Sequence, residues 1–169
     1  MLVIVRTETA HDYDRISEIH IAAFYSHPFS NQTEHLIVEH LREAGGLTLS
    51  LVAEVDGVVL GHVALSPVTI GGIDCGWFAL GPIGVEPTAQ RRGIGSRLVE
   101  GSLERLRELG AQGCVVVGDP GYYERFGFRH EPGLTVSGVP LEYVLCVAFS
   151  SSVPVGAVTH HPAFEMERN

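Results

Sequence analysis

The sequence predicts an α+β fold in which a central mixed, mostly antiparallel sheet is flanked by helices. Two turn dipeptides, Asp56-Gly57 and Gly71-Gly72, separate three apolar runs, and this arrangement is typical of an antiparallel meander. Amphipathic segments with helical spacing lie on either side of these runs. A wholly apolar run at 114–117 is typical of a strand that is buried on both faces. At 169 residues, the chain predicts one domain with a sizeable core.

The segment before the meander predicts one strand and two helices. Residues 3–6 form a short apolar run that favours a first strand. A start resembling a capping box at 9–12 precedes the first helix, and the same pattern at 31–34 precedes the second. The second helix is expected to end at Gly45-Gly46. The loop at 25–30 between the two helices carries aromatic and polar side chains.

The remaining elements follow in chain order: strands at 47–55, 58–66 and 73–85, a helix at 96–109, the apolar strand at 114–117, a short helix at 122–126, and last strands around Phe128 and at 142–149. Gly81-Pro82 interrupts the third of these strands. Because proline has no N–H to donate to a sheet, we expect a bulge or break there, with an edge-strand irregularity as the alternative. Residues from Ser150 onward predict an irregular tail.

The run Gln90-Arg91-Arg92-Gly93-Ile94-Gly95 lies between an apolar strand and an amphipathic helix. A glycine-rich turn at a helix N-terminus offers unpaired N–H groups and the positive end of the helix dipole, which together favour a phosphate or pyrophosphate. Arg91, Arg92 and Arg97 add positive charge in a chain whose net charge is −9. Taken alone, the run is equally compatible with an ordinary turn that starts a helix.

Two known phosphate-binding loops do not fit this run. A Walker A loop needs Lys-Ser or Lys-Thr after its last glycine, whereas Ser96-Arg97 follows Gly95. The dinucleotide fingerprint needs a third small residue where Leu98 stands, and it belongs to the first strand and helix of a parallel unit.

Two segments together, 85–98 and 122–128, resemble the GNAT superfamily of acyl-CoA-dependent N-acyltransferases in their order and spacing. The first matches the Arg/Gln-x-x-Gly-x-Gly/Ala coenzyme A loop of that family, and the second matches its Tyr-x-x-x-Gly-Phe element. The resemblance covers nearly all of residues 3–149. It is strongest to a poorly characterised group of bacterial acetyltransferases that share the runs Leu-Gly-Pro at 80–82 and Gly-Asp-Pro-x-Tyr-Tyr at 118–123 and the ending His-Pro-Ala-Phe at 161–164.

The resemblance implies an N-acetyltransferase domain at 1–149, with splayed central strands, and a C-terminal tail at 150–169 packed on the same domain. It implies that acetyl-CoA is the cosubstrate and that its acetyl group passes directly to a primary amine, without a covalent enzyme intermediate. The residues implied to line the pantetheine arm are Ile83, Gly84 and Val85. Those implied to cradle the pyrophosphate are Arg91, Arg92, Gly93, Ile94, Gly95 and Ser96.

The resemblance also implies a general acid, Tyr123, which lies four residues before Gly127. In many members of the family this hydroxyl protonates the departing thiolate, as a phenol with a pKa of about 10 can do. A core tyrosine is the alternative. Many relatives carry a catalytic carboxylate on the strand before the loop, but the matching stretch at 77–80 has none. This leaves the base open between Asp74 and Glu86, which flank the stretch, and His62 on the adjacent strand.

The composition excludes several other functions. A net charge of −9 disfavours nucleic acid as a partner, and it would suit a cationic amine or a basic peptide, although ordinary solubility also explains it. No apolar stretch approaches the length of a membrane span, so we expect a cytoplasmic protein without a membrane partner. Three scattered cysteines predict neither a disulfide framework nor a metal site.

The expected partner is therefore a small-molecule or peptide amine, and a homodimer is left open. The main alternative function is an acyl-CoA-binding or sensing module that lacks catalytic activity, which the missing carboxylate favours. An anion-binding interaction domain is a third reading, but it does not explain the tyrosine element.

Overall fold

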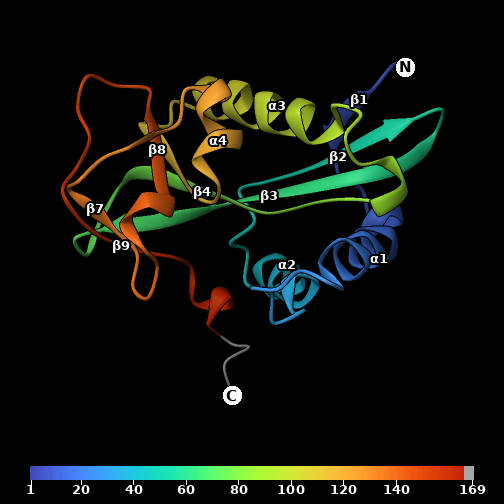
Figure 1. Cartoon of the computed structure of the whole chain (residues 1–169), viewed down its shortest axis with the longest axis horizontal. Helices are drawn as coiled ribbons and strands as arrows, with labels where there is room; N and C mark the ends of the chain where they lie inside the picture. The colour runs from blue at the N-terminus through green and yellow to red at the C-terminus, as the bar shows by residue number, and fades with distance from the viewer. Residues whose placement is uncertain (166–169) are drawn as a thin grey trace.

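The computed structural model describes residues 1–165 and confirms the predicted α+β class (Figure 1). The strands of the described residues are β1 (Ile4–Thr7), β2 (Leu49–Val55), β3 (Val58–Ile70), β4 (Ile73–Val85), β5 (Gly113–Val117), β6 (Arg129–His130), β7 (Leu134–Thr135), β8 (Val144–Ala148) and β9 (Gly156–Thr159). They form one sheet in the order β1-β2-β3-β4-β5-β8-β6, with β9 paired to β3 and β7. The β4–β5 and β7–β9 pairs are parallel, and the other described pairs are antiparallel.

Helices cover both faces of the sheet. They are α1 (Tyr13–Phe24), α2 (Glu34–Glu43), α3 (Ile94–Glu108) and α4 (Pro120–Tyr123), with 3₁₀ turns at Ala10–Asp12, Pro87–Ala89, Glu124–Phe126, Leu141–Tyr143 and Pro162–Phe164. In Figure 1, α3 and α4 lie above the sheet and α1 and α2 lie below it. Separate apolar clusters fill the two interfaces, one around Leu98 of α3 and one around Ile16 of α1. No helix within residues 1–165 is long and apolar enough to cross a membrane.

The two predicted hairpin turns are confirmed. Asp56 and Gly57 have φ angles of +51° and +79°, and Gly71 and Gly72 have φ angles of +61° and +79°. Two consecutive left-handed residues are what a two-residue type I′ turn requires, and its twist matches that of the flanking strands. The first hairpin sets the register of β2 against β3, and the second sets the register of β3 against β4.

The bulge predicted at Gly81-Pro82 is also confirmed. Leu80 pairs with Leu65 and Ile83 pairs with Val63, so two residues of β4 lie opposite one residue of β3. In a regular strand, Leu80 and Ile83 would point to opposite faces of the sheet. With the bulge, both pack into the apolar cluster beneath α3.

β4 and β5 part after only three paired residues, as the resemblance implied. Trp77, Phe78 and Ala79 pair with 113–115, whereas β4 beyond Ala79 remains paired only with β3. β5 meanwhile continues along β8 as far as Val117. We call these diverging segments, 80–85 of β4 and 116–117 of β5, the β4–β5 wedge. Where the strands do meet, Gly113 is needed, because a Cβ there would lie 2.5 Å from the Trp77 ring.

Part of the predicted tail is regular structure. The sequence predicted an irregular segment from Ser150 onward, and this is wrong for Gly156–Thr159, which forms β9 beside the end of β3. Farther along, Ala163 packs into the apolar cluster of α1 and α2. The division into a domain at 1–149 and a tail at 150–169 stays a prediction, and its last four residues lie outside the described residues.

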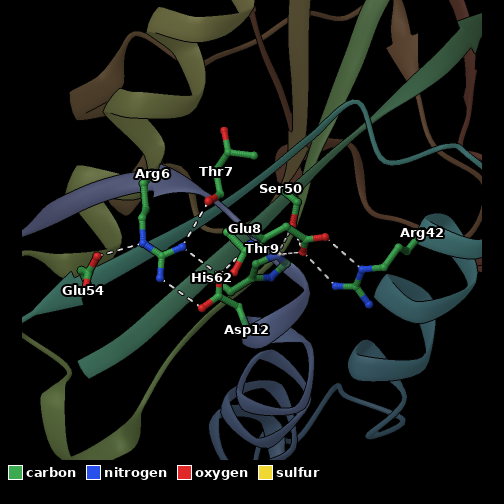
Figure 2. Close-up of polar contacts among 9 residues, drawn as sticks. All are labelled: Arg6, Thr7, Glu8, Thr9, Asp12, Arg42, Ser50, Glu54 and His62. Atoms are coloured by element: carbon green, nitrogen blue, oxygen red, sulfur yellow. Dashed lines mark hydrogen bonds and ion pairs between the residues drawn. The ribbon is translucent and has the colours of Figure 1, made fainter. Parts of the chain in front are cut away.

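A chain of polar side chains is buried between α1, α2 and the sheet. Arg42 donates two hydrogen bonds to Glu8, at 2.9 and 2.8 Å. The Ser50 hydroxyl bonds to the same carboxylate and lies 2.8 Å from Nε2 of His62. Nδ1 of His62 in turn lies 2.8 Å from Nε2 of His20. Figure 2 shows Glu8 between Arg42 on one side and Ser50 and His62 on the other.

A second ionic cluster joins β1 to β2 and to the start of α1 (Figure 2). Arg6 contacts Glu54 at 2.8 Å and Asp12 at 2.7 Å. The hydrogen bonds from this guanidinium lower the pKa of Asp12 to about 2. Asp12 also accepts the Thr9 N–H, which confirms the capping box predicted at 9–12.

The buried histidines predict a pH-dependent stability. Burial lowers the pKa of His20 to about 3 and that of His62 well below its ordinary value, while in the unfolded chain both titrate near about 6.5. As the pH falls from about 6.5 toward 4, the unfolded chain binds protons that the folded chain excludes. The free energy of unfolding should therefore fall, with a slope approaching ~1.4 kcal/mol per pH unit for each histidine.

Denaturant unfolding across this pH range measures the effect. His20→Gln should lower the slope of the unfolding free energy against pH by ~1.4 kcal/mol per pH unit, the contribution of one proton, because glutamine does not titrate. A free energy of unfolding that stays constant from about pH 6.5 to 4.5 would contradict the buried, neutral state of both imidazoles.

Candidate functional site

Two residues at the end of β4, Ile83 and Val85, turn their backbone groups away from β3. The Glu86 N–H donates to the Leu60 carbonyl at 2.8 Å, so Glu86 and Leu60 form a hydrogen-bonded pair at the end of the β3–β4 ladder. Bonded and non-bonded pairs alternate in an antiparallel ladder, so Gly84 and its β3 partner form the next bonded pair. The N–H and C=O groups of Ile83 and Val85 consequently face the β4–β5 wedge.

The loop after β4 prepares the N-terminus of α3. Arg91 and Gly93 have φ angles of +66° and +83°, and Gly93 is the residue that precedes the helix. The first helical hydrogen bond runs from the Arg97 N–H to the Gly93 carbonyl at 3.1 Å. The N–H groups of residues 94–96 therefore precede the hydrogen-bonded ladder and can bind an anion.

The side chains of this loop divide into two groups. Arg91 and Arg92 are exposed and can approach a ligand, whereas the Ile94 side chain is buried in the apolar cluster beneath α3. The side chains of Ile83 and Val85 pack against the same cluster. These three residues can therefore offer a ligand mainly their backbone groups. Gly84 differs from them, because its backbone is paired with β3 and the space that a side chain would occupy lies toward α1.

The structure adds a groove between α3 and the 3₁₀ turn Glu124–Phe126 that the sequence did not indicate. Its volume is about 810 Å³, and its lining carries charges of both signs: Ser96, Glu100, Leu103, Glu104, Arg107, Glu108, Arg125 and Phe126. It begins at the first turn of α3 and runs along that helix. Phe126 is only partly buried and lines this groove. Only the tertiary fold reveals the groove, because it brings the 3₁₀ turn Glu124–Phe126 next to α3 from a distant segment of the sequence.

Tyr122 reaches the same helix start. A Cβ at Gly95 would lie 3.0 Å from the Tyr122 hydroxyl, so the glycine allows this close approach. The Arg125 guanidinium stacks over the Tyr122 ring, 4.8 Å from its centroid. The first turn of α3 is thus bordered by a phenol hydroxyl and by a cation.

Tyr123 is 8% exposed and belongs to the apolar cluster that contains Leu80 of β4 and Val116 of β5, where the two strands part. A Cβ at Gly118 would lie 2.5 Å from the Tyr123 ring, so the ring fills the space beside that glycine. Burial raises the pKa of Tyr123 above its ordinary value, so the hydroxyl stays protonated at neutral pH. Within residues 1–165 this hydroxyl has no hydrogen-bond partner, and it remains a free proton donor.

The three candidate bases that the sequence left open differ in their distance from the site and in their hydrogen-bond or ion-pair partners. Asp74 lies near the opposite end of β4 from Gly84, about 30 Å away along an extended strand. Glu86 is close to the β4–β5 wedge, but its carboxylate is paired with Arg15 at 3.2 Å. His62 is fully buried beside Gly84 in the ladder and is bonded at both ring nitrogens.

A fourth titratable side chain, His20, lies at the site and was missed by the sequence reasoning. Nδ1 of His20 lies 3.0 Å from where a Cβ of Gly84 would be. Among the described residues, this nitrogen is buried and has no hydrogen-bond partner. The signal was present in the sequence, because His20 follows Ile16 by four residues and so shares the buried face of α1.

Comparison with known proteins agrees with this arrangement. The sequence profile of the acetyltransferase (GNAT) family matches residues 13–128. The uncharacterised N-acetyltransferase YhbS of Escherichia coli strain K12 is 41% identical over 110 residues, which span 64% of this chain and 66% of YhbS. The sequence match thus covers slightly less than two thirds of that relative.

Two solved structures are similar over nearly the whole chain. A GNAT family acetyltransferase from Brucella melitensis, crystallised in complex with acetyl-CoA, has a TM-score of 0.87 and 47% identity, covering 96% of this chain and 98% of that one. YhbS from Escherichia coli, crystallised in complex with CoA, has a TM-score of 0.82 and 32% identity, covering 96% and 92%. The profile match, the shared fold and the parted strands together identify the chain as a member of the GNAT family of acetyltransferases.

Proposed function

We propose that this protein transfers the acetyl group of acetyl-CoA directly to a primary amine. The observation that carries the proposal is the β4–β5 wedge, which leaves backbone groups of Ile83 and Val85 unpaired next to the open N-terminus of α3. An unpaired strand edge suits the amides of a pantetheine arm, and a helix N-terminus suits a pyrophosphate. These two features lie one loop apart, as the parts of coenzyme A require.

Acetyl-CoA is assigned as the cosubstrate on two grounds, the backbone groups of this chain and its similarity to relatives crystallised with acetyl-CoA or CoA. The Brucella melitensis relative was crystallised with acetyl-CoA and YhbS with CoA, and both resemble this chain over 96% of its length. In the assignment, Ile83, Gly84 and Val85 line the pantetheine arm. The residues that cradle the pyrophosphate are Arg91, Arg92, Gly93, Ile94, Gly95 and Ser96. The groove along α3 would then take the nucleotide end, with Arg125, which lies over the Tyr122 ring beside the first turn of α3, available to its phosphate.

The chemistry follows from the groups at the wedge. A neutral amine attacks the thioester carbonyl, and a backbone N–H of Ile83 or a neighbouring residue stabilises the negative oxygen of the tetrahedral intermediate. The C–S bond then breaks, and the Tyr123 hydroxyl donates its proton to the departing thiolate. The raised pKa of Tyr123 keeps that proton on the phenol until the thiolate forms.

The acceptor is assigned as an amine of a small molecule or of a peptide. A net charge of −9 attracts a cationic amine to the protein. The loop between α1 and α2 is exposed and carries aromatic rings, including Tyr25 at 71% and Phe29 at 91% exposure. Tyr25 directly follows α1, whose Ala23 side chain lies 3.5 Å from where a Cβ of Gly84 would be. We therefore assign this loop to the acceptor, whose body its rings can contact.

A second function is favoured by a specific observation. The stretch at 77–80 contains no carboxylate, and the nearby Glu86 is committed to Arg15. A chain without a base could bind acyl-CoA as a sensing module and not catalyse transfer. Thiol release from acetyl-CoA across a panel of primary amines distinguishes the two: transfer requires amine-dependent release, whereas a sensing module binds CoA and releases none.

Substitution of Gly95 tests the pyrophosphate assignment. Gly95→Ala places a methyl group where the ligand must approach the N–H groups, so the Kd for CoA should rise at least about tenfold, which corresponds to ~1.4 kcal/mol. Arg92→Ala should raise it less than about threefold, because one exposed charge contributes little. Calorimetric titration with CoA measures both values.

The control for this test is Gly95→Ala combined with Tyr122→Phe. The added methyl group would contact the Tyr122 hydroxyl, and the double variant removes that contact while leaving the methyl group in place. Weak binding should persist in the double variant. Recovery of wild-type affinity would mean that a displaced Tyr122 caused the loss, and unchanged affinity in Gly95→Ala would refute the assignment.

Substitution of Tyr123 tests the general acid. Tyr123→Phe keeps the ring and its packing, so folding and CoA affinity should change little, while kcat should fall by about 10²–10⁴. Tyr122→Phe, which removes the neighbouring hydroxyl, should keep kcat within about threefold at saturating acetyl-CoA. If Tyr123→Phe acetylates a good amine at the wild-type rate, Tyr123 is structural.

A further inference from the structure

We propose that His20 is the base that accepts the proton of the attacking amine, and that His62, Ser50 and Glu8 form a relay that holds His20 in the accepting tautomer. The inference rests on the proposed acetyl transfer and supplies the base that the transfer lacks. Nδ1 of His20 is buried beside β4, and no residue within 1–165 gives it a hydrogen bond.

The position of His20 is the first argument. Its Nδ1 lies against Gly84, and the residues on either side of Gly84 are the two whose backbone groups face the β4–β5 wedge. A Cβ at Gly84 would lie 3.0 Å from this nitrogen, which is closer than an ordinary contact, so the glycine lets the imidazole lie directly against the strand assigned to the thioester. The Phe24 ring stacks on His20, with its centroid 6.1 Å away, and joins it to the loop assigned to the acceptor.

The directions of the hydrogen bonds are the second argument, and they begin at Glu8. Both carboxylate oxygens of Glu8 accept from Arg42, which can only donate. Glu8 also bonds to the Ser50 hydroxyl, which must therefore donate its single proton to the carboxylate. The hydroxyl oxygen is then left to accept from Nε2–H of His62.

The tautomer of each histidine follows from these directions. A neutral His62 that donates from Nε2 has a bare Nδ1, which accepts from Nε2–H of His20. His20 in turn has a bare Nδ1, and this is the nitrogen that lacks a donor. If His20 had only a structural role, leaving this buried acceptor without a partner would cost about 1–3 kcal/mol of folding free energy. A substrate N–H is the donor that would complete the chain.

The charges around His20 explain why a relay is needed. The titratable and charged groups nearby are His62 of β3, His35 of α2, the Glu8–Arg42 pair behind Ser50, and the Glu86–Arg15 pair at the end of β4. Both ion pairs are internally compensated, so no free anion stabilises an imidazolium. Burial lowers the pKa of His20 to about 3, which keeps its lone pair free at neutral pH.

The proton balance closes without a lasting charge on either histidine. As the N–C bond forms, the amine proton moves to Nδ1 of His20 and the Nε2 proton of His20 moves to Nδ1 of His62. The Nε2 proton of His62 moves to Ser50, whose own proton moves to Glu8. The C–S bond breaks with a proton from Tyr123. After the amide leaves, the proton on Glu8 returns along the same bonds to Nδ1 of His20. Water that enters the site left by the amide accepts this proton, and water also reprotonates Tyr123.

Two serines provide a matched test of the relay. Ser50 and Ser66 are both buried on neighbouring strands, but the Ser66 hydroxyl has no partner among the described residues. With the most reactive primary amine of the panel, Ser50→Ala should lower kcat at least about tenfold, with the Kd for CoA unchanged, and Ser66→Ala should leave kcat unchanged. His20→Gln keeps a donor toward His62 but cannot take up a proton, and its kcat should fall by about 10²–10⁴. Wild-type kcat in Ser50→Ala or His20→Gln overturns the proposal.

A second readout does not depend on activity or on the folding of a variant. Nitrogen NMR of the wild-type protein labelled at its histidine rings should show Nδ1 bare and Nε2 protonated in both His20 and His62 at neutral pH. A proton on Nδ1 of His20 overturns the proposal even if the enzyme is active. If CoA binds but no amine releases its thiol, the proposed transfer itself fails; if transfer occurs and the histidine results are negative, only the relay fails.

Discussion

The parting of β4 from β5 after three paired residues is the constraint on which the rest of the site depends. Backbone N–H and C=O groups of a buried strand are normally paired, and leaving them unpaired costs free energy. Here the ladder to β3 and the bulge at Gly81-Pro82 hold β4 in place, while β8 holds β5. The unpaired groups of Ile83 and Val85 are therefore fixed in position before any ligand arrives.

The sheet also separates the two proposed proton-transfer steps. Tyr123 packs into the cluster beneath α3, whereas His20 lies on α1, on the opposite face (Figure 1). A donor for the thiolate and an acceptor for the amine on opposite faces cannot neutralise each other directly. The acidic proton of Tyr123 and the bare nitrogen of His20 can then coexist at one pH, because burial moves their pKa values in opposite directions.

Much of the fold could be predicted from the sequence, because short contiguous segments specify its turns and its bulge. Asp56-Gly57 specifies a hairpin through its left-handed backbone, and Gly81-Pro82 specifies a bulge because proline lacks a donor. The two-residue strands β6 and β7 carry no periodic pattern. β9 pairs with β3 and with β7, and the tertiary fold alone brings these segments together. Local patterns could not reveal these pairings.

The site was only partly predictable for the same reason. The assignments of the loop at 90–95 and of Tyr123 rest on motifs that are contiguous in the sequence. His20 and His62 are 42 residues apart, and only the packing of α1 on β3 and β4 brings their rings together. The groove along α3 likewise needs Arg107 and Arg125 from separate elements.

Hydrogen exchange of the backbone amides, measured with and without CoA, shows whether the β4–β5 wedge and the start of α3 bind the cosubstrate. We expect CoA to slow exchange at Ile83 and Val85 and at residues 94–96, because those N–H groups gain an acceptor that the fold alone does not give them. Amides of β2, which is paired with β1 on one side and with β3 on the other, should be unaffected. Binding of CoA with no added protection at the β4–β5 wedge or at the start of α3 would contradict the account.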